Sequence, residues 1–485
     1  MTELPLVHEL VPAPDPLETC ARCHGLPYLL FLDSAVRHPE TGRYSFLAAD
    51  PATLIRSHGA LTQTRAAASE DWTRVPEDPL GAAARLLAPF TAAPVPGLPP
   101  FQGGAAGYIG YDWGAGLERI PRTRFLDCDV PDVLLGVYDW VIAWDHVARR
   151  AWIISTGLPA AGARRLTRAE TRLRDVRALL ADGRWAGNRS PGTRPPRPAR
   201  AAPSYAFSSA SGMPGLRSNF TRADYLAAVR RVIEYIRAGD IFQANLAQRF
   251  EAPLVGEPFD FYRRLRARNA APFSAFLDFA EVAIASSSPE RFLRVDDGRV
   301  EARPIKGTRP RGRTESEDAA LASALAESPK DRAENVMIVD VLRNDLSRVC
   351  EPGTVRAPEL FAVERYATVQ HLVSTVVGRL APHHGTGDLV RAAFPGGSVT
   401  GAPKVRAMQV IAELEPTPRR VYCGAIGYWS LTGALDTSVA IRTCQVLGDD
   451  VYFQAGGGIV ADSQPEAEYA ETLDKAQGMI AALAP

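Results

Sequence analysis

The sequence predicts a mixed α/β (α+β) protein in which strands and helices alternate along the chain. Two successive β-runs rich in Val, Ile, Trp and Tyr occupy residues 131–146 ("PDVLLGVYDWVIAWDH") and residues 149–155 ("RRAWIIS"). An amphipathic helix is predicted over residues 221–239, with Tyr225, Val229, Val232, Ile233 and Ile236 on one face. With 485 residues, the chain is long enough for two or three domain-sized units or for one large intertwined unit.

The composition is that of an ordinary globular protein. Apolar residues make up 46% of the chain, and Lys+Arg and Asp+Glu both number 55, so the formal net charge is zero. Nucleic-acid and membrane-surface proteins usually carry a basic excess, and this balance argues against both classes. The N-terminal residues lack the basic start and apolar run of a signal peptide, and no apolar stretch approaches the ~20 residues of a membrane span. We therefore predict a cytoplasmic protein.

Composition divides the chain into three regions. Residues 1–185 form an N-terminal region that includes the glycine-rich stretch 101–114, which lacks a dinucleotide-binding pattern and is predicted to be a closely packed strand and turn. Residues 186–216 are rich in Pro, Arg and Ser and are predicted to be a linker. Residues 217–485 form the third region, and candidate site residues concentrate there. The six cysteines, including those of "CARCH" at 20–24, are predicted to be reduced thiols.

A lysine and a glutamate flank a predicted hairpin. Lys306 lies in "RPIKGT" next to Gly307, and a lysine near a protein interior is costly unless it is paired or neutral. A three-residue loop at residues 296–298 would place Glu290 and Lys306 on one face, whereas a two-residue loop would place them on opposite faces. The alternative is a surface salt bridge between strands.

Two predicted helices carry glutamates that suit a hard cation. Glu334 follows a helix start at Ser328 and Pro329, and Glu468, Glu471 and Lys475 are spaced on one face of the last helix. Carboxylates with few histidines nearby favour Mg²⁺. The alternative is that each glutamate is a solvated helix residue.

Three further features are typical of anion binding. The glycine turn in "FPGGSVTGAPK" leads into a helix start near Lys404, where free N–H groups could meet an anion. Gly456, Gly457 and Gly458 end a strand and leave room for a ligand to approach the backbone. Arg442 ends an alternating strand and could bind a carboxylate through two hydrogen bonds.

Taken together, these segments resemble the chorismate-utilising enzymes over almost the whole chain. The resemblance rests on "GDIFQANLAQRF", "PFSAFL", "SSPERF", "RPIKGTRPRG", "RAENVMIVDVLRNDLSRV", "AFPGGSVTGAPKVRAM", "CGAIGYWS", "DTSVAIRT" and "AGGGIVADSQPEAEYAETLDKA". It implies the chorismate-utilising enzyme fold, in which two facing antiparallel sheets, flanked by helices, are formed by both halves of the chain. The N-terminal region, 1–185, would be of the anthranilate synthase component I type, and residues 217–485 would form the chorismate-binding catalytic domain.

Within the family, the sequence is most similar to the component I branch that forms aminodeoxychorismate. Anthranilate enzymes typically read Pro-Ile-Ala-Gly-Thr where this chain has Pro304 to Thr308 with Lys306. The resemblance implies transaminase-type amino transfer to C4 of chorismate, toward 4-aminobenzoate and folate. The alternatives are an anthranilate-type or an isochorismate- or salicylate-type enzyme, and a non-catalytic binding protein.

The resemblance also assigns roles to individual residues. Lys306 would attack the ring, Glu290 would act as general acid, and His371 would lie near the leaving hydroxyl. Glu334 and Glu471, with Glu468 nearby, would bind Mg²⁺. Substrate contacts would come from the following residues: Gly307, Thr308, Tyr422, Arg442, Gly456, Gly457, Gly458 and Lys475. A pocket that holds tryptophan in relatives would be lined by Ser34, Arg43, Tyr44, Pro272, Phe273 and Ser274.

Ammonia for the reaction would come from a second protein. The chain has no glycine-flanked nucleophilic cysteine of a glutaminase, so we expect a separate glutamine amidotransferase partner. Chorismate and this partner are the expected binding partners, and Mg²⁺ is the expected cofactor.

Overall fold

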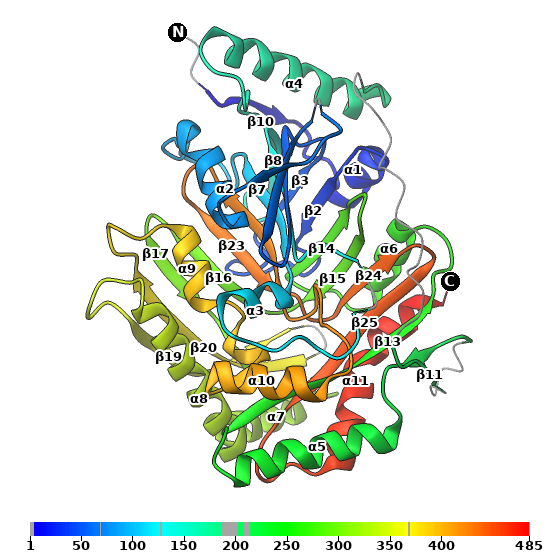
Figure 1. Cartoon of the computed structure of the whole chain (residues 1–485). Helices are drawn as coiled ribbons and strands as arrows, with labels where there is room; N and C mark the ends of the chain where they lie inside the picture. Colours follow the sequence, from blue (N-terminus) through cyan, green and yellow to red (C-terminus); the bar gives the residue numbers. More distant parts are fainter. Residues whose placement is uncertain are drawn as a thin grey trace.

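The computed structural model describes residues 4–67, 69–126, 129–185, 202–207, 214–366 and 369–484. Within these ranges the chain forms two large antiparallel sheets, of 13 and 12 strands, with α-helices on their outer faces (Figure 1). This architecture confirms the predicted fold class.

The 13-stranded sheet, here sheet A, takes strands from both ends of the chain. In spatial order it contains β1 (Leu6–Leu10), β10 (Arg150–Ser155), β9 (Trp140–Asp145), β3 (Tyr44–Ala48), β2 (Leu29–Asp33), β14 (Phe273–Asp278), β15 (Ala283–Ser288), β24 (Thr443–Leu447), β25 (Asp450–Ile459), β13 (Gln243–Pro253), β12 (Arg217–Ser218) and β11 (Tyr205–Ala206), with β21 (Gly401–Ala402) also paired to β13.

The 12-stranded sheet, sheet B, is equally mixed. In spatial order it contains β18 (Ile305–Pro310), β20 (Val369–Arg379), β17 (Arg299–Ala302), β16 (Arg291–Asp296), β23 (Leu435–Val439), β22 (Ala425–Ser430), β7 (Gly104–Ile109), β8 (Val133–Tyr138), β4 (Thr53–His58), β5 (Leu61–Ala66) and β6 (Thr73–Val75), with β19 (Arg356–Arg365) also paired to β20. Both halves of the chain therefore build both sheets.

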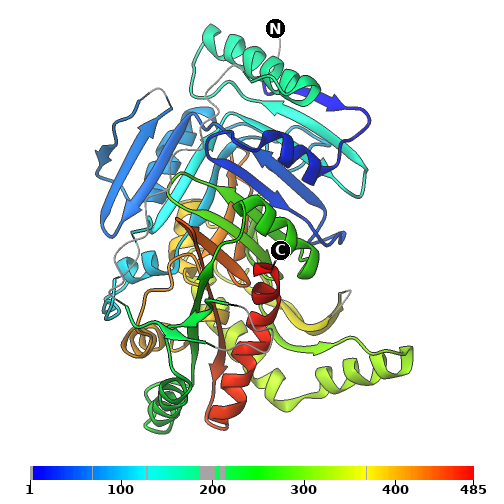
Figure 2. The same cartoon turned by 90° about the vertical axis from the view of Figure 1, so that its right-hand side faces the viewer.

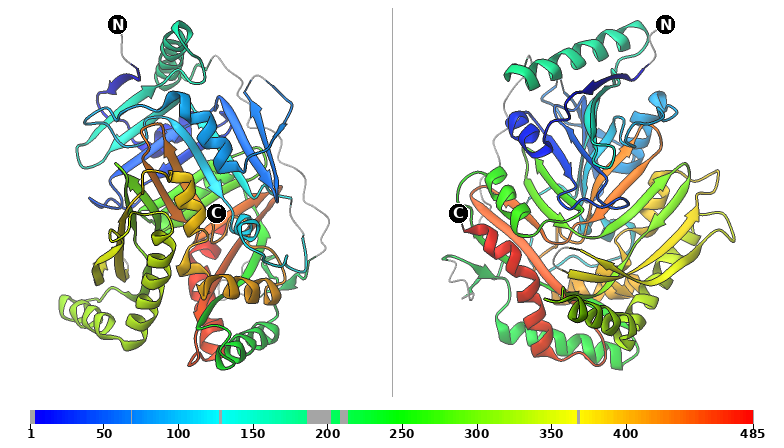
Figure 3. Two further views of the ribbon diagram at one scale, coloured as in Figure 1. Left: turned by 60° about the vertical axis from the view of Figure 1, so that its left-hand side comes forward. Right: turned by 180° about the vertical axis from the view of Figure 1, so that it is seen from behind.

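The helices cover the two outer faces. They are α1 (Pro16–Cys23), α2 (Pro79–Leu87), α3 (Gly114–Leu117), α4 (Ala163–Asp182), α5 (Arg222–Arg237), α6 (Pro258–Arg268), α7 (Glu315–Glu327), α8 (Pro329–Ser347), α9 (Thr386–Ala393), α10 (Lys404–Leu414) and α11 (Pro465–Leu483). Figure 2 shows α7 and α8 at the lower right, away from the N-terminal strands. Figure 3 shows α11, in red, lying along β25.

Hydrophobic cores in the described residues hold the layers together. Between the sheets, side chains such as Leu30 and Ile284 of sheet A pack with Leu134 and Ile426 of sheet B. A second core joins sheet A to helices that include α6 and α11, and a third joins sheet B to helices that include α8 and α9. This order of layers packs the helices of the C-terminal half against the outer faces of both sheets.

The elements predicted from the sequence can be compared directly with the observed helices and strands. The predicted helix at 221–239 is α5, and Thr221 caps it by accepting a hydrogen bond from the Asp224 amide. The predicted β-runs are β8, β9 and β10. Most of the predicted linker, residues 186–201 and 208–213, lies outside the described residues, while Tyr205–Ala206 forms an edge strand of sheet A. No helix in the described ranges combines the length and apolar character that a bilayer crossing requires.

The glycine-rich stretch 101–114 contains β7, and its glycines permit close packing as predicted. A Cβ atom on Gly104 would lie 2.3 Å from the Trp429 carbonyl oxygen of β22, and one on Gly107 would lie 2.2 Å from that of Leu134 in β8. No side chain fits at either distance, so the sheet tolerates only glycine there.

We expect Gly107→Ala to destabilise the protein strongly. Its φ of +153° and the short approach to Leu134 would combine strain with overpacking, at the upper end of the ~1–3 kcal/mol typical of overpacked cores. A large fall in the thermal unfolding midpoint is the expected measurement. Gly116→Ala is the control, since no atom lies within 4 Å of its added Cβ. Equal midpoints for the two variants would contradict the prediction.

Candidate active site

Lys306 is turned into the protein by an irregularity in its strand. β17 and the start of β18 pair with β20 in one register (Ala302 with Val376, Ile305 with Val373), and the register then shifts before Thr308 pairs with His371. Such a bulge redirects a side chain. The adjacent Gly307 has φ +86°, and a Cβ there would lie 2.9 Å from Leu325 Cδ1, so glycine is required beside the lysine.

The hairpin that precedes Lys306 differs from the predicted one. Asp296 pairs with Arg299, so the loop is the two-residue turn Asp297-Gly298 with positive φ at both positions, and the predicted three-residue loop is wrong. The pairing of β16 with β23 shifts register between Arg291 and Leu293. At this shift the consecutive residues Phe292 and Leu293 both pack into the same core, although neighbouring side chains in a regular strand face opposite sides.

This second bulge reverses the alternation of the strand. It returns Glu290 to the face that carries Val300, Ala302 and Lys306. The predicted shared face of Glu290 and Lys306 is thus observed, but it arises from a bulge in β16 rather than from the loop length.

Burial and carboxylates set the charge state of Lys306. Its side chain is 12% exposed, and its Nζ lies 4.0 Å from Glu334 Oε2. Burial lowers the pKa of Lys306, with Lys475 acting in the same direction, while Glu334, Glu290 and Glu471 act against it. Burial likewise raises the pKa of Glu334, although Lys306 and Lys330 oppose this.

The glutamates of the last helix converge on the glycine strand. A Cβ on Gly457 of β25 would lie 3.0 Å from Glu468 Oε2 and 3.3 Å from Glu471 Oε1. Glu468 accepts a hydrogen bond of 2.6 Å from Ser463, and Glu471 forms a 2.6 Å ion pair with Lys475. Burial would raise the pKa of Glu471, but Lys475, with Lys330 and Lys306 further away, holds it below its ordinary value.

These carboxylates fit Mg²⁺ when a ligand completes the site. The described residues contain no group of three acidic, His or Cys side chains close enough to hold a metal ion by themselves. Mg²⁺ is usually bound by one or two protein carboxylates with substrate and water oxygens, and Glu334 and Glu471 interact electrostatically across the site. The donor set is therefore suitable for Mg²⁺, with a bound anion supplying further oxygens.

Glu290 is a buried acid with a raised pKa. Its side chain accepts a 2.6 Å hydrogen bond from Ser398 Oγ, which lies in the short 3₁₀ helix Gly397–Val399. Burial raises the pKa of Glu290 to about 7, against the opposing influence of Ser398, Lys306, the Ile305 amide and Lys475. Ser398 was not predicted as a site residue, although its segment had been singled out as a possible anion site.

A histidine and an arginine lie on the other side of the site. Thr308 Oγ1 and His371 Nδ1 are 2.9 Å apart, and burial, together with Arg442, lowers the pKa of His371 to about 4. Arg442 is half-buried in a left-handed backbone conformation (φ 51°), and within the described part of the chain no acidic side chain forms an ion pair with it. Tyr422 is close enough to influence the pKa of Arg442. An unpaired, half-buried guanidinium is suited to a carboxylate ligand.

The glycines of β25 offer a second polar surface to a ligand. β24 pairs with β25 only as far as Cys444 with Phe453, so Gly456, Gly457 and Gly458 pair with β13 on one side. The Gly456 carbonyl oxygen accepts a 2.8 Å hydrogen bond from Lys475. Among the described strands, none pairs with the opposite edge of this glycine segment.

The predicted anion site at Lys404 is not supported. Its Nζ forms a 2.5 Å ion pair with Asp345 and donates a hydrogen bond to the Ala393 carbonyl oxygen. Burial lowers the pKa of Lys404, with Asp345 opposing this. The lysine thus joins α10 to α8 and α9.

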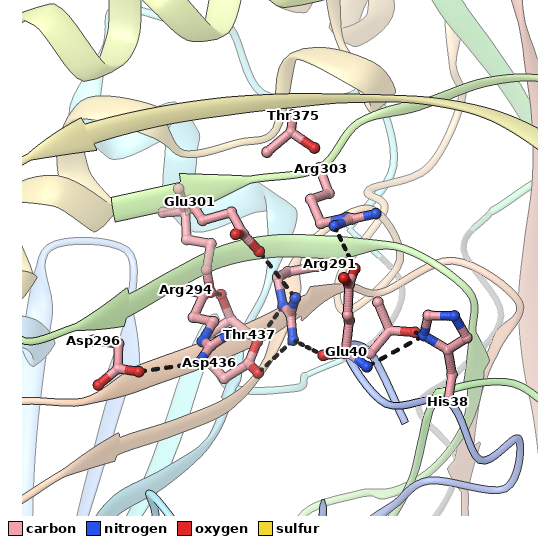
Figure 4. Close-up of polar contacts among 12 residues, drawn as sticks. His38, Glu40, Arg291, Arg294, Asp296, Glu301, Arg303, Thr375, Asp436 and Thr437 are labelled. Atoms are coloured by element: carbon pink, nitrogen blue, oxygen red, sulfur yellow. Dashed lines mark hydrogen bonds and ion pairs between the residues drawn. The ribbon is translucent and has the colours of Figure 1, made fainter. Parts of the chain in front are cut away.

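The predicted amino-acid pocket is a separate cavity of about 320 Å³. All six predicted residues line it: Ser34, Arg43, Tyr44, Pro272, Phe273 and Ser274. Figure 4 shows the polar network on its floor, where Arg291 forms ion pairs with Glu301 and Asp436 and Arg303 pairs with Glu40. What this pocket binds remains a prediction.

Comparisons with known proteins agree with the fold. The family described as chorismate binding enzyme matches residues 40–481. Aminodeoxychorismate synthase component 1 of Klebsiella aerogenes is 42% identical over 451 residues, covering 93% of this chain and 92% of that protein. Anthranilate synthase component 1 of Pseudomonas putida is 38% identical over 473 residues, covering 97% and 92%. The crystal structure of anthranilate synthase component I from Streptococcus pneumoniae superposes with a TM-score of 0.74 at 32% identity, covering 92% of this chain and 94% of that one.

Removal of the Ser398 hydroxyl should raise the pKa of Glu290 further. The hydrogen bond stabilises the ionised carboxylate, so Ser398→Ala favours the protonated form and shifts the titration upward from about 7. Carbon-13 NMR of labelled glutamate, assigned with Glu290→Gln, measures this pKa directly. Ser347→Ala serves as the control, because Ser347 donates only to a backbone carbonyl in its own helix. An unchanged or lower pKa in Ser398→Ala would contradict the assignment.

Proposed function

The chain belongs to the family of chorismate binding enzymes, and we propose that it aminates chorismate at C4 to give 4-amino-4-deoxychorismate. The reaction replaces the C4 hydroxyl by an amino group from ammonia and leads toward 4-aminobenzoate and folate. Relatives named aminodeoxychorismate synthase component 1 match this chain over almost its full length. The site residues named below have the roles that we propose for this reaction.

Lys306 is the observation that carries the proposal. Anthranilate-type enzymes typically have alanine at this position, and relatives named anthranilate synthase also match this chain well. The buried ammonium lies 4.0 Å from Glu334 and is held by a bulge that directs it into the site. A buried amine of lowered pKa is suited to act as a nucleophile.

The amine attacks C2 of the chorismate ring. The C2–N bond forms, the two conjugated ring double bonds shift, and the C4–O bond breaks with its electron pair on oxygen. Glu290 donates the proton that lets the hydroxyl leave as water, a role that suits a carboxylic acid with a pKa of about 7. His371 is neutral because its pKa is about 4, and it can hydrogen-bond the hydroxyl before departure.

Binding of the substrate depends on cations and backbone groups around the glycine strand. Arg442 would bind one carboxylate of chorismate, with Tyr422 and the amides of Gly456, Gly457 and Gly458 nearby. Glu334 and Glu471, assisted by Glu468, would hold Mg²⁺, which orients and neutralises the ring carboxylate when bound. Gly307 and Thr308 would line the ring face, and Lys475 would add positive charge.

Ammonia is supplied by a separate glutamine amidotransferase subunit in this proposal. The designation "component 1" of the relatives supports a second component. The five cysteines in the described ranges are buried, and burial raises the pKa of Cys20, Cys350, Cys423 and Cys444, which disfavours a nucleophilic thiolate. The predicted location, the cytoplasm, stays a prediction.

Product analysis tests the proposed reaction. With chorismate, Mg²⁺ and an ammonium salt, we expect 4-amino-4-deoxychorismate, with loss of turnover on chelation by EDTA. Glutamine should replace the ammonium salt only when an amidotransferase is added. Anthranilate or isochorismate as the main product would refute the assignment, and glutamine-dependent turnover by this chain alone would refute the partner.

Lys306→Ala should abolish most amination while chorismate binding and the fold are retained, because the amine acts after binding. Wild-type enzyme with chorismate and Mg²⁺, but without ammonia, should accumulate an adduct on Lys306 that mass spectrometry detects. Arg343→Ala is the control, since this cation of α8 is 52% exposed and pairs with Asp340 of its own helix. Full activity of Lys306→Ala with no adduct would overturn the nucleophile role.

A further inference from the structure

Arg419 is a buried arginine that connects three separate segments of the chain. Its guanidinium donates hydrogen bonds to both carboxylate oxygens of Glu415, at 2.9 and 2.6 Å. It also donates to the carbonyl oxygen of Val399 at 2.8 Å and to that of Asn245 at 2.7 Å. The side chain is 1% exposed, and the proposed reaction does not use it.

Stability alone is a weak reason to bury this ion pair. Taking two charges out of water costs several kcal/mol per ion, and well-packed apolar residues in their place are often as stable or more so. A guanidinium adds geometry, because its planar and rigid fork holds several acceptors at once. Here the acceptors beyond Glu415 are main-chain carbonyl groups of two other segments, the end of a 3₁₀ helix and β13. Arg419 therefore sets the relative position of these segments.

The contact with Val399 lies one residue from the hydroxyl that supports the candidate acid. Val399 ends the 3₁₀ helix Gly397–Val399, and the residue before it is Ser398. The Ser398 hydroxyl donates the 2.6 Å hydrogen bond to Oε1 of Glu290. By holding the Val399 carbonyl group, Arg419 holds the end of the turn that carries this hydroxyl.

Packing holds the start of the same turn. A Cβ atom on Gly397 would lie 2.9 Å from Val341 Cγ1 of α8, so the turn and the helix are in close contact. The Gly396 carbonyl oxygen accepts a 3.0 Å hydrogen bond from Thr400 Oγ1. Ser398 lies between this packed start and the end that Arg419 holds, so its hydroxyl is placed by both.

The Ser398 hydrogen bond decides which oxygen of Glu290 carries the acidic proton. A hydroxyl that donates to Oε1 makes that oxygen the acceptor, so the proton of the neutral acid sits on Oε2. After proton transfer, the same hydrogen bond stabilises the carboxylate that remains. A rotated or distant hydroxyl would serve neither purpose, so the position of the turn matters to the acid.

Other charged and titratable groups also face Glu290. Lys306, Lys475 and the Ile305 amide lower its pKa together with Ser398, against the burial that raises it to about 7. Cys423 is close enough for Glu290 and Arg419 to act on the pKa of its thiol in opposite directions. A test of Arg419 must therefore keep a positive charge in its place.

We propose that Arg419 is a positioning residue that holds the Ser398 hydroxyl against Oε1 of Glu290, an inference that rests on the proposed function. The guanidinium fixes the end of the 3₁₀ helix, and the helix fixes the hydroxyl. The hydroxyl leaves Oε2 of Glu290 to deliver its proton to the C4 hydroxyl of chorismate as the C4–O bond breaks. Arg419 acts through Ser398 and needs no contact with the substrate.

The first test is the variant Arg419→Lys. Lysine keeps the charge beside Glu415 but loses the fork, so it does not hold Val399 and Asn245 as well. The Ser398 hydroxyl then loses its fixed position, and the carboxylate form of Glu290 loses stabilisation. Carbon-13 NMR of labelled glutamate should show the pKa of Glu290 rising from about 7 by roughly 0.5–1, the equivalent of one hydrogen bond.

Arg172→Lys is the matched control. Arg172 of α4 is 13% exposed, and its guanidinium binds the carboxylates of Asp139 and Asp50 and the Asp50 carbonyl oxygen. The variant therefore loses a comparable set of contacts at a position that does not hold the Ser398 turn. The pKa of Glu290 should stay unchanged in it. A rise equal to that in Arg419→Lys would indicate a general response of the fold and would overturn the inference.

A double variant distinguishes positioning from an independent effect. Ser398→Ala alone should raise the pKa of Glu290, because the hydroxyl is absent. If Arg419 acts through this hydroxyl, Arg419→Lys combined with Ser398→Ala should raise the pKa no further than Ser398→Ala does. Additive rises would overturn the inference, as would an unchanged or lower pKa in Arg419→Lys alone.

The proposed reaction supplies a second measurement. The Lys306 adduct forms from chorismate and Mg²⁺ without ammonia, and this step needs the proton of Glu290. Arg419→Lys should slow adduct formation about tenfold at neutral pH, with chorismate Kd unchanged, because the acid is present but poorly oriented. The decline of this rate at high pH should also move upward, since Glu290 keeps its proton to a higher pH. A weaker Kd with an unchanged rate would assign Arg419 to substrate binding and overturn the inference.

A second variant covers the case in which Arg419→Lys folds poorly. Glu415→Gln combined with Arg419→Met leaves no buried charge unpaired, and the new amide oxygen can still accept from the Ala247 amide as Glu415 does. It should raise the pKa of Glu290 in the same direction. The NMR titration needs no turnover, so it separates the two proposals. If wild-type enzyme forms no 4-amino-4-deoxychorismate, the proposed function fails, while the titration alone decides whether Arg419 positions Ser398.

Discussion

The arrangement of the site depends on keeping the amine of Lys306 buried but out of direct contact with a carboxylate. A buried ammonium with no partner is strongly unfavourable, whereas a carboxylate in direct contact would stabilise the charged form and suppress its nucleophilicity. The structure lies between these limits, since Glu334 is 4.0 Å away and Lys475 opposes its effect. Glu471 is instead bound by Lys475 at 2.6 Å, which removes the nearest acid of α11 from direct pairing with Lys306.

This balance requires elements from distant parts of the chain. Lys306 belongs to sheet B, Gln243 and the glycine strand belong to sheet A, and the glutamates come from α8 and α11. Glycine is what allows these elements to meet. Gly307 makes room beside Lys306, Gly457 faces the carboxylates of Glu468 and Glu471, and Gly458 faces Gln243. A side chain at any of these positions would occupy space that the ligand or the catalytic groups need.

The sequence predicted the identities of these groups better than their geometry. Lys306 was singled out as a lysine beside a glycine, Glu334 and Glu471 as carboxylates on two helices, and Arg442 as an arginine at the end of an alternating strand. The orientation of Glu290 could not be predicted, because it depends on a bulge created by pairing with β23, more than 140 residues later in the chain. Lys404 was misjudged for a similar reason: its partner Asp345 lies in another helix, 59 residues away.

Ser398 and Gln243 show a different limit of the sequence. Ser398 meets Glu290 across 108 residues, and nothing in its own segment indicates that contact. Gln243 stands in a strand whose residues are nearly all buried, so no alternation marks the side of the strand that it faces. Its unpaired amide becomes visible only in the folded protein.

The hairpin of β16 and β17 also separates the candidate site from the pocket of about 320 Å³. Val300, Ala302 and Lys306 face the core and the candidate site, while the intervening Glu301 and Arg303 line this pocket (Figure 4). Glu290 and Arg291 are neighbours in the chain, but Arg291 lines the pocket and pairs with Glu301 and Asp436, whereas Glu290 accepts a hydrogen bond from Ser398. One sheet therefore separates the pocket from the site. The same short segment carries Glu290, which belongs to the site, and Arg291, which lines the pocket.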